Sequence, residues 1–479
     1  MGTTLEQDLF RYRRVEKHLL TLIESGSLKK EEKLPSLRQL SRQLQVSIST
    51  VSQAYLELEK KGVISSRERS GFFVTATARE LPQPVSRPQL PMIPTFGQRS
   101  DLIQTVLEAL GNHSLLPFGV VSPAEELLPG KTLTRLLTAA LRADPSKALN
   151  YTGVHGDLEL RRQIAMRALD AGIATSAEEI LITSGALEGI AIALRLLTRP
   201  GDNVLIQSPS YFCFLQLLEN CGLRAIEIPS SATGIDPADI RRAIDRFDIR
   251  AVIMVPNFNN PDGSLTPDEV KKEIVGILAR RNIPLVEDDV YGELSFAGRR
   301  PATCKSFDEQ GLVILASSFS KTVAPGYRVG WMIPGRFYDK AVELKTTTNI
   351  CTASPNQMAL AAFLREGYYE RHLRRLRRAI ETQVETVLLG LKRDFPPATR
   401  AAHPAGGAAV WVELPQGIDA VEYFYRARAM GISLAPGPIF STQDRYNNFI
   451  RLSCNGIWNE RLEQGLARLG ELARELSSV

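Results

Sequence analysis

Residues 313–330 have the sequence VILASSFSKTVAPGYRVG, and this segment decides the fold of the 479-residue chain. The short apolar run Val313–Ala316 predicts a buried strand, which is followed by a hydroxyl-rich loop that carries Lys321. In open α/β sheets, ligands bind at the carboxyl ends of the strands. Because a lysine in such a loop can form a Schiff base with an aldehyde, we expect a ligand site around Lys321.

The neighbouring residues offer groups that bind phosphate. The hydroxyls of Ser318 and Ser320, together with the guanidinium of Arg328, can hold such a group. A second phosphate-binding element is predicted at Thr183–Ala186, where a strand ends and a helix begins. The free N–H groups at a helix N-terminus favour anions, so both segments indicate the same ligand chemistry.

Three further segments that follow predicted strands supply groups suited to an aromatic ring. A buried carboxylate such as Asp288 can keep a pyridine nitrogen protonated, which makes the ring an electron sink. Tyr291 and Asn260 can bond a phenolic oxygen, and Tyr211 can stack on the ring face. Each segment alone has an ordinary explanation as a turn or a helix cap. Taken together and in this order, the segments indicate a site for pyridoxal 5'-phosphate (PLP).

The chain divides into three predicted zones. Residues 79–99 include five prolines and no hydrophobic periodicity, which predicts a semi-rigid linker between residues 1–78 and 100–479. In the last zone helical patterns alternate with short apolar strands, so we expect an α/β domain with a mostly parallel sheet. The large domain is expected at about 145–350, and a smaller α+β lobe at about 100–144 and 351–479.

The N-terminal zone predicts a helix-turn-helix followed by a wing. Ser36 opens a capping box before a short helix, Leu37–Leu44. A tight connection leads from this helix to the next one, the recognition helix, which is expected to end at Lys61 and is followed by a glycine. Two β-prone runs, Val63–Ser66 and Phe72–Thr75, complete the pattern and form the predicted wing.

Charge and side-chain chemistry suit this N-terminal zone to double-stranded DNA. Residues 1–80 carry 14 Lys/Arg against 10 Asp/Glu, so most of the net charge of +5 lies there. The first turn of a recognition helix lies nearest the bases, and here it is rich in hydroxyls. Arginines on the preceding helix and at the wing can contact phosphates. The candidate DNA-binding residues are Arg38, Ser47, Ser49, Thr50, Arg67 and Arg69.

A helical dimerisation module whose serines are only caps is the alternative for this zone. However, the segments LPSLRQLSRQLQVSISTVSQAYLELEKKGVI and RSGFFV resemble the GntR family of winged-helix regulators. Two positions depart from that family's pattern. Ile48 stands where an arginine is usual, and Arg69 stands where the first glycine of the wing is usual. These departures affect the base contacts that the resemblance implies more than they affect the fold.

The chain beyond the linker resembles the class I/II aminotransferases, which are fold-type I PLP enzymes. The resemblance makes Lys321 the Schiff-base lysine and Asp288 the partner of the pyridine nitrogen, with Tyr211 stacked on the ring. It implies that Arg451 binds a substrate carboxylate, for which a bidentate guanidinium is suited. It also implies a homodimer in which Tyr151 contacts the phosphate in the partner subunit's site. The remaining implied cofactor contacts are Asn260 and Tyr291 at the phenolic oxygen, and Gly185, Ala186, Ser318, Ser320 and Arg328 at the phosphate.

A GntR-type winged helix, a proline-bearing linker and an aminotransferase-like body together resemble the MocR subfamily of regulators. That resemblance implies a head-to-tail homodimer that binds an operator and senses a small amine, an amino acid or PLP. A working aminotransferase with an appended DNA-binding domain is the alternative, because one fold serves both roles. A body that only dimerises is a third hypothesis, against which the intact Lys321, Asp288 and Arg451 argue.

The remaining composition predicts a cytoplasmic protein. The five cysteines are scattered, odd in number and without CxxC spacing, which suits a reducing compartment. No apolar run approaches the roughly 20 residues needed to cross a bilayer, and the N-terminus lacks the apolar segment of a secretory signal. No His/Cys cluster has metal-ligand spacing, so we expect no metal.

Overall fold

The computed structural model divides the chain into two compact units. The first comprises Met1–Pro82, Thr382–Arg400 and Trp458–Val479, and the second comprises Gln83–Glu381 and Ala401–Ile457. The domain boundaries proposed from the sequence stay predictions. The residues that the structure describes are 12–16, 18–20, 22–23, 28–29, 31–60, 63–67, 70–75, 81–84, 92–95 and 100–477.

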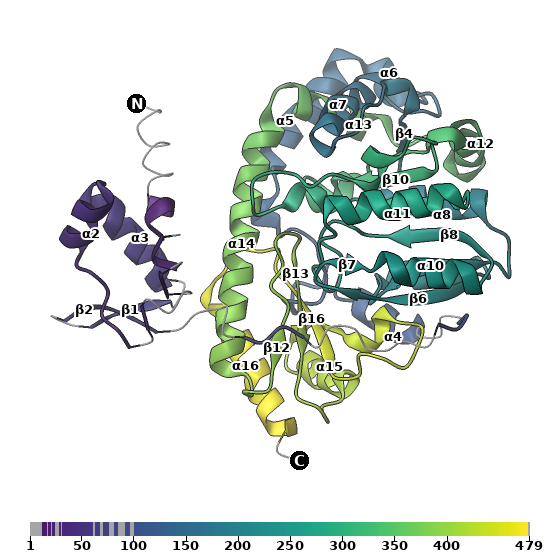
Figure 1. Ribbon diagram of the computed structural model, residues 1–479. Coiled ribbons are helices and arrows are strands. Elements are labelled where there is room, and N and C mark those ends of the chain that lie inside the picture. The colour runs from purple at the N-terminus through teal and green to yellow at the C-terminus, as the bar shows by residue number, and fades with distance from the viewer. Residues whose placement is uncertain are drawn as a thin grey trace. The chain divides into compact units, whose positions relative to one another are not determined.

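The N-terminal residues form the predicted helix-turn-helix and wing (Figure 1). Ser36 caps the first of the two helices, because its Oγ accepts the N–H of Gln39 at 3.2 Å. Val51, Leu58 and the ring of Tyr55 are buried in the core of this domain. The expected end of the recognition helix at Lys61 lies outside the described residues, and the wing strands differ from the expected bounds by one residue at their ends, because strand ends carry no hydrophobic signal. These elements are α2 (Leu37–Leu44), α3 (Ile48–Lys60), β1 (Ile64–Arg67) and β2 (Gly71–Val74).

Within the described residues, an eight-stranded sheet organises the second unit. Six of these strands run parallel, whereas β7 and β11 run antiparallel to their neighbours. The predicted mostly parallel sheet is therefore confirmed, and the strand expected at Val313–Ala316 extends to Ser318. The order across the sheet is β4 (Leu181–Thr183), β11 (Gly330–Ile333), β10 (Val313–Ser318), β9 (Leu285–Asp288), β8 (Ile249–Met254), β5 (Asn203–Ser208), β6 (Arg224–Ser231) and β7 (Gly234–Ile235).

Helices cover both faces of this sheet. Gly189 of α8 (Ala186–Leu197) lies so close to β10 that a Cβ added to it would be 3.4 Å from the Cβ of Ala316. Leu315 points to the opposite face, because successive residues of a strand alternate in direction. It belongs to a buried cluster that also contains residues of α13 (Ser354–Arg365). Since both faces are covered, β10 is apolar from Val313 to Ala316, and its two serines lie at its carboxyl end.

The C-terminal part of the chain contributes a smaller sheet, of four strands in the described region. Trp411 pairs directly with Arg451 across β13 and β16, so the two side chains lie on the same face. The strands are β12 (Arg400–Ala401), β13 (Ala409–Glu413), β16 (Phe449–Ser453) and β15 (Ala435–Pro436), and a separate pair is formed by β3 (Leu116–Pro117) and β14 (Ile432–Ser433).

The other helices that Figure 1 shows vary in length from one to several turns. None of the helices in the described part of the chain is both long and apolar enough to cross a membrane. They are α4 (Ser100–Leu107), α5 (Gly130–Ala143), α6 (Pro145–Leu149), α7 (Leu158–Ala168), α9 (Phe212–Asn220), α10 (Pro237–Arg246), α11 (Asp268–Arg280), α12 (Tyr338–Asn349), α14 (Tyr368–Asp394), α15 (Ala420–Ala429) and α16 (Glu460–Ser477).

One buried hydrogen bond ties the recognition helix to the start of the helix before it. The hydroxyl of Tyr55 donates to the carbonyl of Pro35 at 2.6 Å. We expect Tyr55→Phe to lower the free energy of unfolding of this domain by about 1 kcal/mol, since the carbonyl loses its donor. Chemical denaturation followed by circular dichroism measures this change. Tyr425→Phe, at a ring that is 51% exposed, is the control and should cost nothing measurable, and equal stability of the two variants would contradict the prediction.

Candidate cofactor and DNA-binding sites

The carboxyl ends of the parallel strands bring together most of the residues predicted from the sequence. Lys321 ends the short helix η7 (Phe319–Lys321), which directly follows β10. Asp288 is the last residue of β9, and its Cα pairs with that of Ala316 in β10. Tyr211 directly precedes α9, in the segment that follows β5. Neighbouring parallel strands end at the same edge of the sheet, so residues distant in sequence meet there.

A cup of hydrogen-bond donors lies next to Lys321. Arg328 donates through Nη1 to the hydroxyl of Ser320 at 3.2 Å and through Nη2 to the carbonyl of Ser184 at 3.1 Å. The hydroxyls of Ser318 and Ser320 are 2.8 Å apart. Gly185 has a φ of +101°, and a Cβ there would lie 2.6 Å from Nη2 of Arg328. The glycine therefore keeps the N-terminus of α8, which begins at Ala186, open beside the guanidinium, as a phosphate requires.

Lys321 is half-buried, and its Nζ donates to the carbonyl of Val121 at 2.5 Å. Loss of surrounding water and the nearby positive charge of Arg451 lower the pKa of Lys321 to about 8, although Asp288 opposes this change. An ordinary lysine is almost fully protonated near neutral pH. Lys321 instead has a substantial neutral fraction, which is the form that attacks an aldehyde.

Asp288 is buried and accepts the N–H of Val290 at 3.2 Å. Burial, followed by the negative charge of Asp289, raises the pKa of Asp288 to about 7. A positively charged ring nitrogen placed beside it would lower that pKa again and would hold the carboxylate in its charged form. The side chain is therefore suited to a cationic partner.

Two other predicted ring contacts lie close together in the site. Asn260 donates from Nδ2 to the hydroxyl of Tyr291 at 3.4 Å, and both side chains are buried. Tyr211 is half-buried and packs between Phe212 and Phe214, with ring centroids 4.8 and 5.3 Å away. Stacking of Tyr211 on a cofactor ring stays a prediction.

Arg451 is 1% exposed, and this burial lowers the pKa of its guanidinium to about 10. Nη1 donates to Oδ1 of Asn260 at 3.0 Å, and Nη2 donates to the carbonyl of Gly119. The Nε of Arg451 is buried and has no hydrogen-bond partner among the described residues. An unpaired donor on a buried cation is costly, so this position is suited to an anionic ligand such as a carboxylate.

Tyr151 lies apart from the other predicted contacts. It follows α6, and its side chain is 81% exposed on this chain. The residue therefore stands outside the cup that its own chain forms. Its predicted role in the site of a partner subunit stays a prediction.

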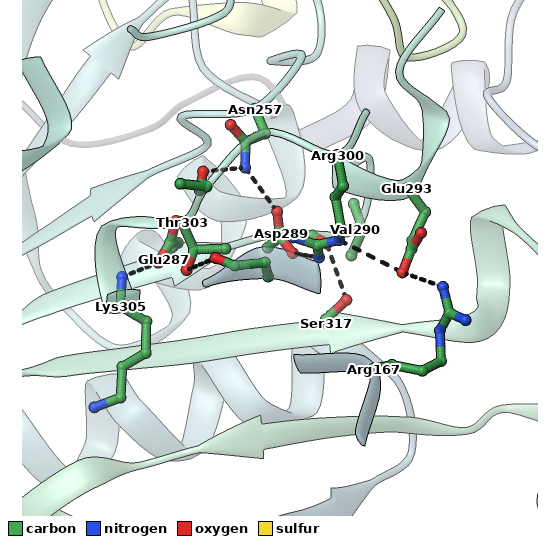
Figure 2. Close-up of polar contacts among 12 residues, drawn as sticks. Arg167, Asn257, Glu287, Asp289, Val290, Glu293, Arg300, Thr303, Lys305 and Ser317 are labelled. Carbon is green, nitrogen blue, oxygen red and sulfur yellow. Dashed lines mark hydrogen bonds and ion pairs between the residues drawn. The ribbon is translucent and has the colours of Figure 1, made fainter. Parts of the chain in front are cut away.

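A network of buried charges that the sequence did not indicate supports the cofactor site (Figure 2). Asp289 forms an ion pair with Arg300 and accepts from Nδ2 of Asn257 at 3.0 Å. Arg300 also lies 3.4 Å from Glu293, which pairs with Arg167 at 2.9 Å. Burial alone would raise the pKa of Glu293, but these arginines more than offset it and lower that pKa. The only sequence signal for this network is the run of three acids at residues 287–289.

The predicted DNA-binding residues differ in how they are engaged. Ser47 caps α3, since its Oγ accepts the N–H of Thr50 at 3.1 Å, and Thr50 is buried with its hydroxyl 2.7 Å from that Oγ. Thr50 is thus engaged within the domain, whereas Ser49 and Arg38 are exposed. Arg67 pairs with Glu31 and covers the ring of a neighbouring phenylalanine. Arg69 lies outside the described residues.

Sequence reasoning overlooked two residues on the exposed face of the recognition helix. Gln53 lies on the exposed side of α3 and donates from Nε2 to Glu57 at 3.0 Å, and Leu56 is 45% exposed. Both follow Ser49 at helical spacing, which is the signal that could have identified them. An exposed stripe on this helix is the surface expected to enter a major groove.

Together these sites define a class of protein in which a winged-helix domain is joined to an aminotransferase-type body. The family model for class I and II aminotransferases matches residues 124–469, and the model for bacterial regulatory proteins of the gntR family matches residues 11–74. The chain therefore belongs to the class I and II aminotransferase family and carries a GntR domain. This combination is the domain organisation of the MocR subfamily of transcription regulators.

Individual relatives include both regulators and enzymes. The chain is 38% identical over 464 residues to the HTH-type transcriptional regulator YjiR of Escherichia coli, and the match covers 96% of this chain and 98% of YjiR. It is 31% identical over 385 residues to 2-aminoadipate transaminase of Thermus thermophilus, covering 80% and 96% of the two chains. The crystal structure of LysN, an α-aminoadipate aminotransferase from the same organism, complexed with N-(5'-phosphopyridoxyl)-L-leucine, has a TM-score of 0.73. Its identity is 30%, with 80% and 98% of the chains covered.

The aminotransferase family implies PLP as the cofactor, and the residues present fit that group. The start of α8 at Gly185, where a Cβ would crowd Arg328, and the donors of Arg328 and Ser320 suit its phosphate. Lys321 would supply the amine for its aldehyde, and Asp288 would supply the carboxylate for its ring nitrogen.

The buried charge network generates a testable contrast. Arg300→Leu leaves the buried Asp289 without its cation, so we expect the free energy of unfolding to fall by about 3–5 kcal/mol. Arg281→Leu removes an exposed partner of Asp245 and should cost less than about 1 kcal/mol, because solvent already screens that pair. Chemical denaturation of the two variants measures the difference. Similar losses in both variants would show that the network contributes no more than a surface pair.

Proposed function

We propose that this protein is a PLP-dependent transcription regulator that binds double-stranded DNA through its winged helix. Its body senses a small amine, an amino acid or PLP. The observation that supports this most directly is that one chain carries both a helix-turn-helix and a group of polar residues suited to PLP around Lys321. Its relatives that match over nearly the whole chain are regulators by name. A cytoplasmic location, supported by the free cysteines, is part of the proposal.

Each residue of the body has a defined task in this proposal. Bound PLP supplies an aldehyde that an amine can capture and a ring that withdraws electrons. Arg328 and Ser320 bind the phosphate, and Asp288 holds a proton at the ring nitrogen by charge attraction. Lys321 provides the resident amine, which an effector amine displaces. Arg451 binds the carboxylate of an amino-acid effector through the donor that has no partner in the described part of the protein.

The signal is proposed to begin at residues 119–121. The carbonyl of Gly119 accepts from Arg451, and the carbonyl of Val121 accepts from the amine of Lys321. An effector that displaces Lys321 would change the contact at Val121, and its carboxylate on Arg451 would add a contact beside the one to Gly119. A ligand shifts a conformational equilibrium only through such differences in contact between two states.

A head-to-tail homodimer completes the proposed assembly. Tyr151 is 81% exposed, and Leu149, two residues before it, is 86% exposed. Burial of these side chains against a second copy would remove apolar surface from water and would bring Tyr151 to the partner subunit's phosphate cup.

Aminotransferase activity is the second candidate function, and a specific observation favours it. The Nε of Arg451, which has no partner among the residues described, lies in the same site as Lys321, whose pKa is lowered. A site that binds a carboxylate beside a lysine that moves protons has the groups that transamination uses. Turnover of an amino acid and a keto acid by the purified protein tests this candidate directly.

The amine of Lys321 generates a pH prediction. When purified protein is mixed with PLP, the visible absorbance of PLP should shift to that of a protein-bound Schiff base, at a rate that rises roughly fiftyfold from pH 6 to pH 8, because only the neutral amine attacks. Above about pH 8 the rate should level, since the pKa of Lys321 is lowered to about 8. Stopped-flow absorbance measures it. Lys321→Ala should show no such change after mixing, whereas Lys131→Ala should show it in full, and an equal change in Lys321→Ala would refute the assignment.

DNA binding is tested by retardation of the DNA upstream of the protein's own or a neighbouring gene. Arg38→Ala should weaken binding about equally on all sequences and should lower the slope of log affinity against log salt by about one. Arg365→Ala, at an exposed arginine of the body, is the matched control. Fast transamination without specific retardation would favour the enzyme instead of the regulator.

A further inference from the structure

A buried ion pair joins α12 to the first turn of α8, beside the candidate phosphate cup. Lys345 of α12 is fully buried, and its Nζ lies 2.8 Å from Oε2 of Glu188 in α8. The Nζ also donates to the hydroxyl of Thr352 at 3.2 Å. A lysine is almost never buried completely unless a partner compensates for the lost water. The place of this amine therefore depends on the carboxylate of Glu188.

Glu188 helps to hold the residue that precedes the glycine of the cup. Its Oε2 accepts the backbone N–H of Ser184. Asn349, the last residue of α12, donates from Nδ2 to the hydroxyl of Ser184 at 3.1 Å. The carbonyl of Ser184 accepts from Arg328. All three polar groups of Ser184 are thus engaged, and the backbone that leads into the cup is held in place from three sides.

The carboxylate of Glu188 has two opposing effects on a phosphate bound in the cup. It orients Ser184, and it stabilises the first turn of α8 because negative charge there interacts favourably with the helix dipole. However, a negative charge at this helix N-terminus also repels a phosphate bound beside it, and burial weakens the screening of that repulsion by solvent. A cation next to Glu188 removes the conflict.

Lys345 supplies that cation. Among the residues that the structure describes, it is the only one that forms an ion pair with Glu188. The second carboxylate oxygen of Glu188, Oε1, is buried and has no hydrogen-bond partner in the same part of the chain. Removal of the amine would therefore leave a buried negative charge that little else offsets.

We propose that Lys345 is a positioning residue for the phosphate of the ligand. It neutralises Glu188, so that Glu188 can orient Ser184 without repelling the phosphate. The inference rests on the proposed function only in that this phosphate is taken to belong to PLP. The cup itself can be tested with inorganic phosphate, which needs neither Lys321 nor Asp288.

Binding of inorganic phosphate and of PLP to the full-length protein, freed of bound cofactor, tests this role by equilibrium titration. Lys345→Met should weaken both ligands by about tenfold or more, because Glu188 then repels the phosphate. Pyridoxal has the ring and aldehyde of PLP but no phosphate, so its affinity should stay unchanged. Unchanged binding of inorganic phosphate, or an equal loss for PLP and pyridoxal, would overturn the proposal.

Replacement of the carboxylate separates a charge effect from a packing effect. Glu188→Gln keeps an oxygen that can accept from Ser184 but leaves the charge of Lys345 unopposed, so it should bind inorganic phosphate about threefold to tenfold more tightly. The double variant Glu188→Gln/Lys345→Met contains no buried charge at this position, and its affinity should return to within about threefold of the unmodified protein. These two variants decide the matter even where Lys345→Met fails to fold. Weaker binding in both of them would show a packing role and would contradict the proposal.

Lys305 offers a matched control, because it is also a mostly buried lysine with an ion-pair partner, Asp308, at 2.9 Å. Its Nζ donates to the carbonyl of Val313 at the start of β10, at the opposite end of that strand from Lys321. Lys305→Met should lower the free energy of unfolding and leave the phosphate affinity unchanged. An equal loss of phosphate affinity in Lys305→Met and Lys345→Met would argue against a specific role. The expected pattern with inorganic phosphate, without any binding of PLP, would refute the proposed function and support the role of Lys345.

Discussion

The cofactor site depends on how three consecutive buried acids at the end of β9 are satisfied. Glu287 accepts the N–H groups of Cys304 and Lys305 at 2.8 and 2.9 Å. Asp289 is held by Arg300 and an asparagine. Asp288, between them, has a single backbone donor. Because an unpaired buried charge is costly, the neighbours are fixed by protein groups and the middle carboxylate remains available for a ligand cation. The candidate cofactor site therefore depends on hydrogen-bond and ion-pair partners that are distributed unequally over Glu287, Asp288 and Asp289.

The second important constraint links two parts of the body that are distant in sequence. Arg451 belongs to the small sheet, but its guanidinium contacts Asn260 after β8 and Gly119 near the start of the body. Lys321 contacts the same early segment through Val121. The residues of the candidate site are therefore joined to these segments by direct contacts. No long pathway has to be assumed, since each element touches the site itself.

The sequence predicts those features of the structure that a local pattern of residues determines. Apolar runs predict the parallel strands, and polar residues directly after them predict Lys321, Asp288 and Gly185 at one edge. The partners of buried charges could not be predicted, because Arg300 and Arg167 reach them through tertiary folding. The antiparallel β11 and the burial of Thr50 also depend on packing rather than on periodicity. Tyr151 shows a further limit, because a contact with a second chain leaves no pattern within one sequence. That contact stays a prediction.

The lowered pKa of Lys321 has a chemical consequence for an unloaded chain. At pH 7.5 roughly a quarter of such an amine is neutral, so it is a ready target for any carbonyl electrophile in its surroundings. The donor cup at Gly185 and Arg328 then discriminates among electrophiles, because it binds only molecules whose phosphate lies at the right distance from the carbonyl. Small metabolic aldehydes without that anchor would be captured only transiently. The fold thus separates reactivity from selectivity, because the nucleophile follows β10 whereas the phosphate-binding donors lie after β4 and before β11.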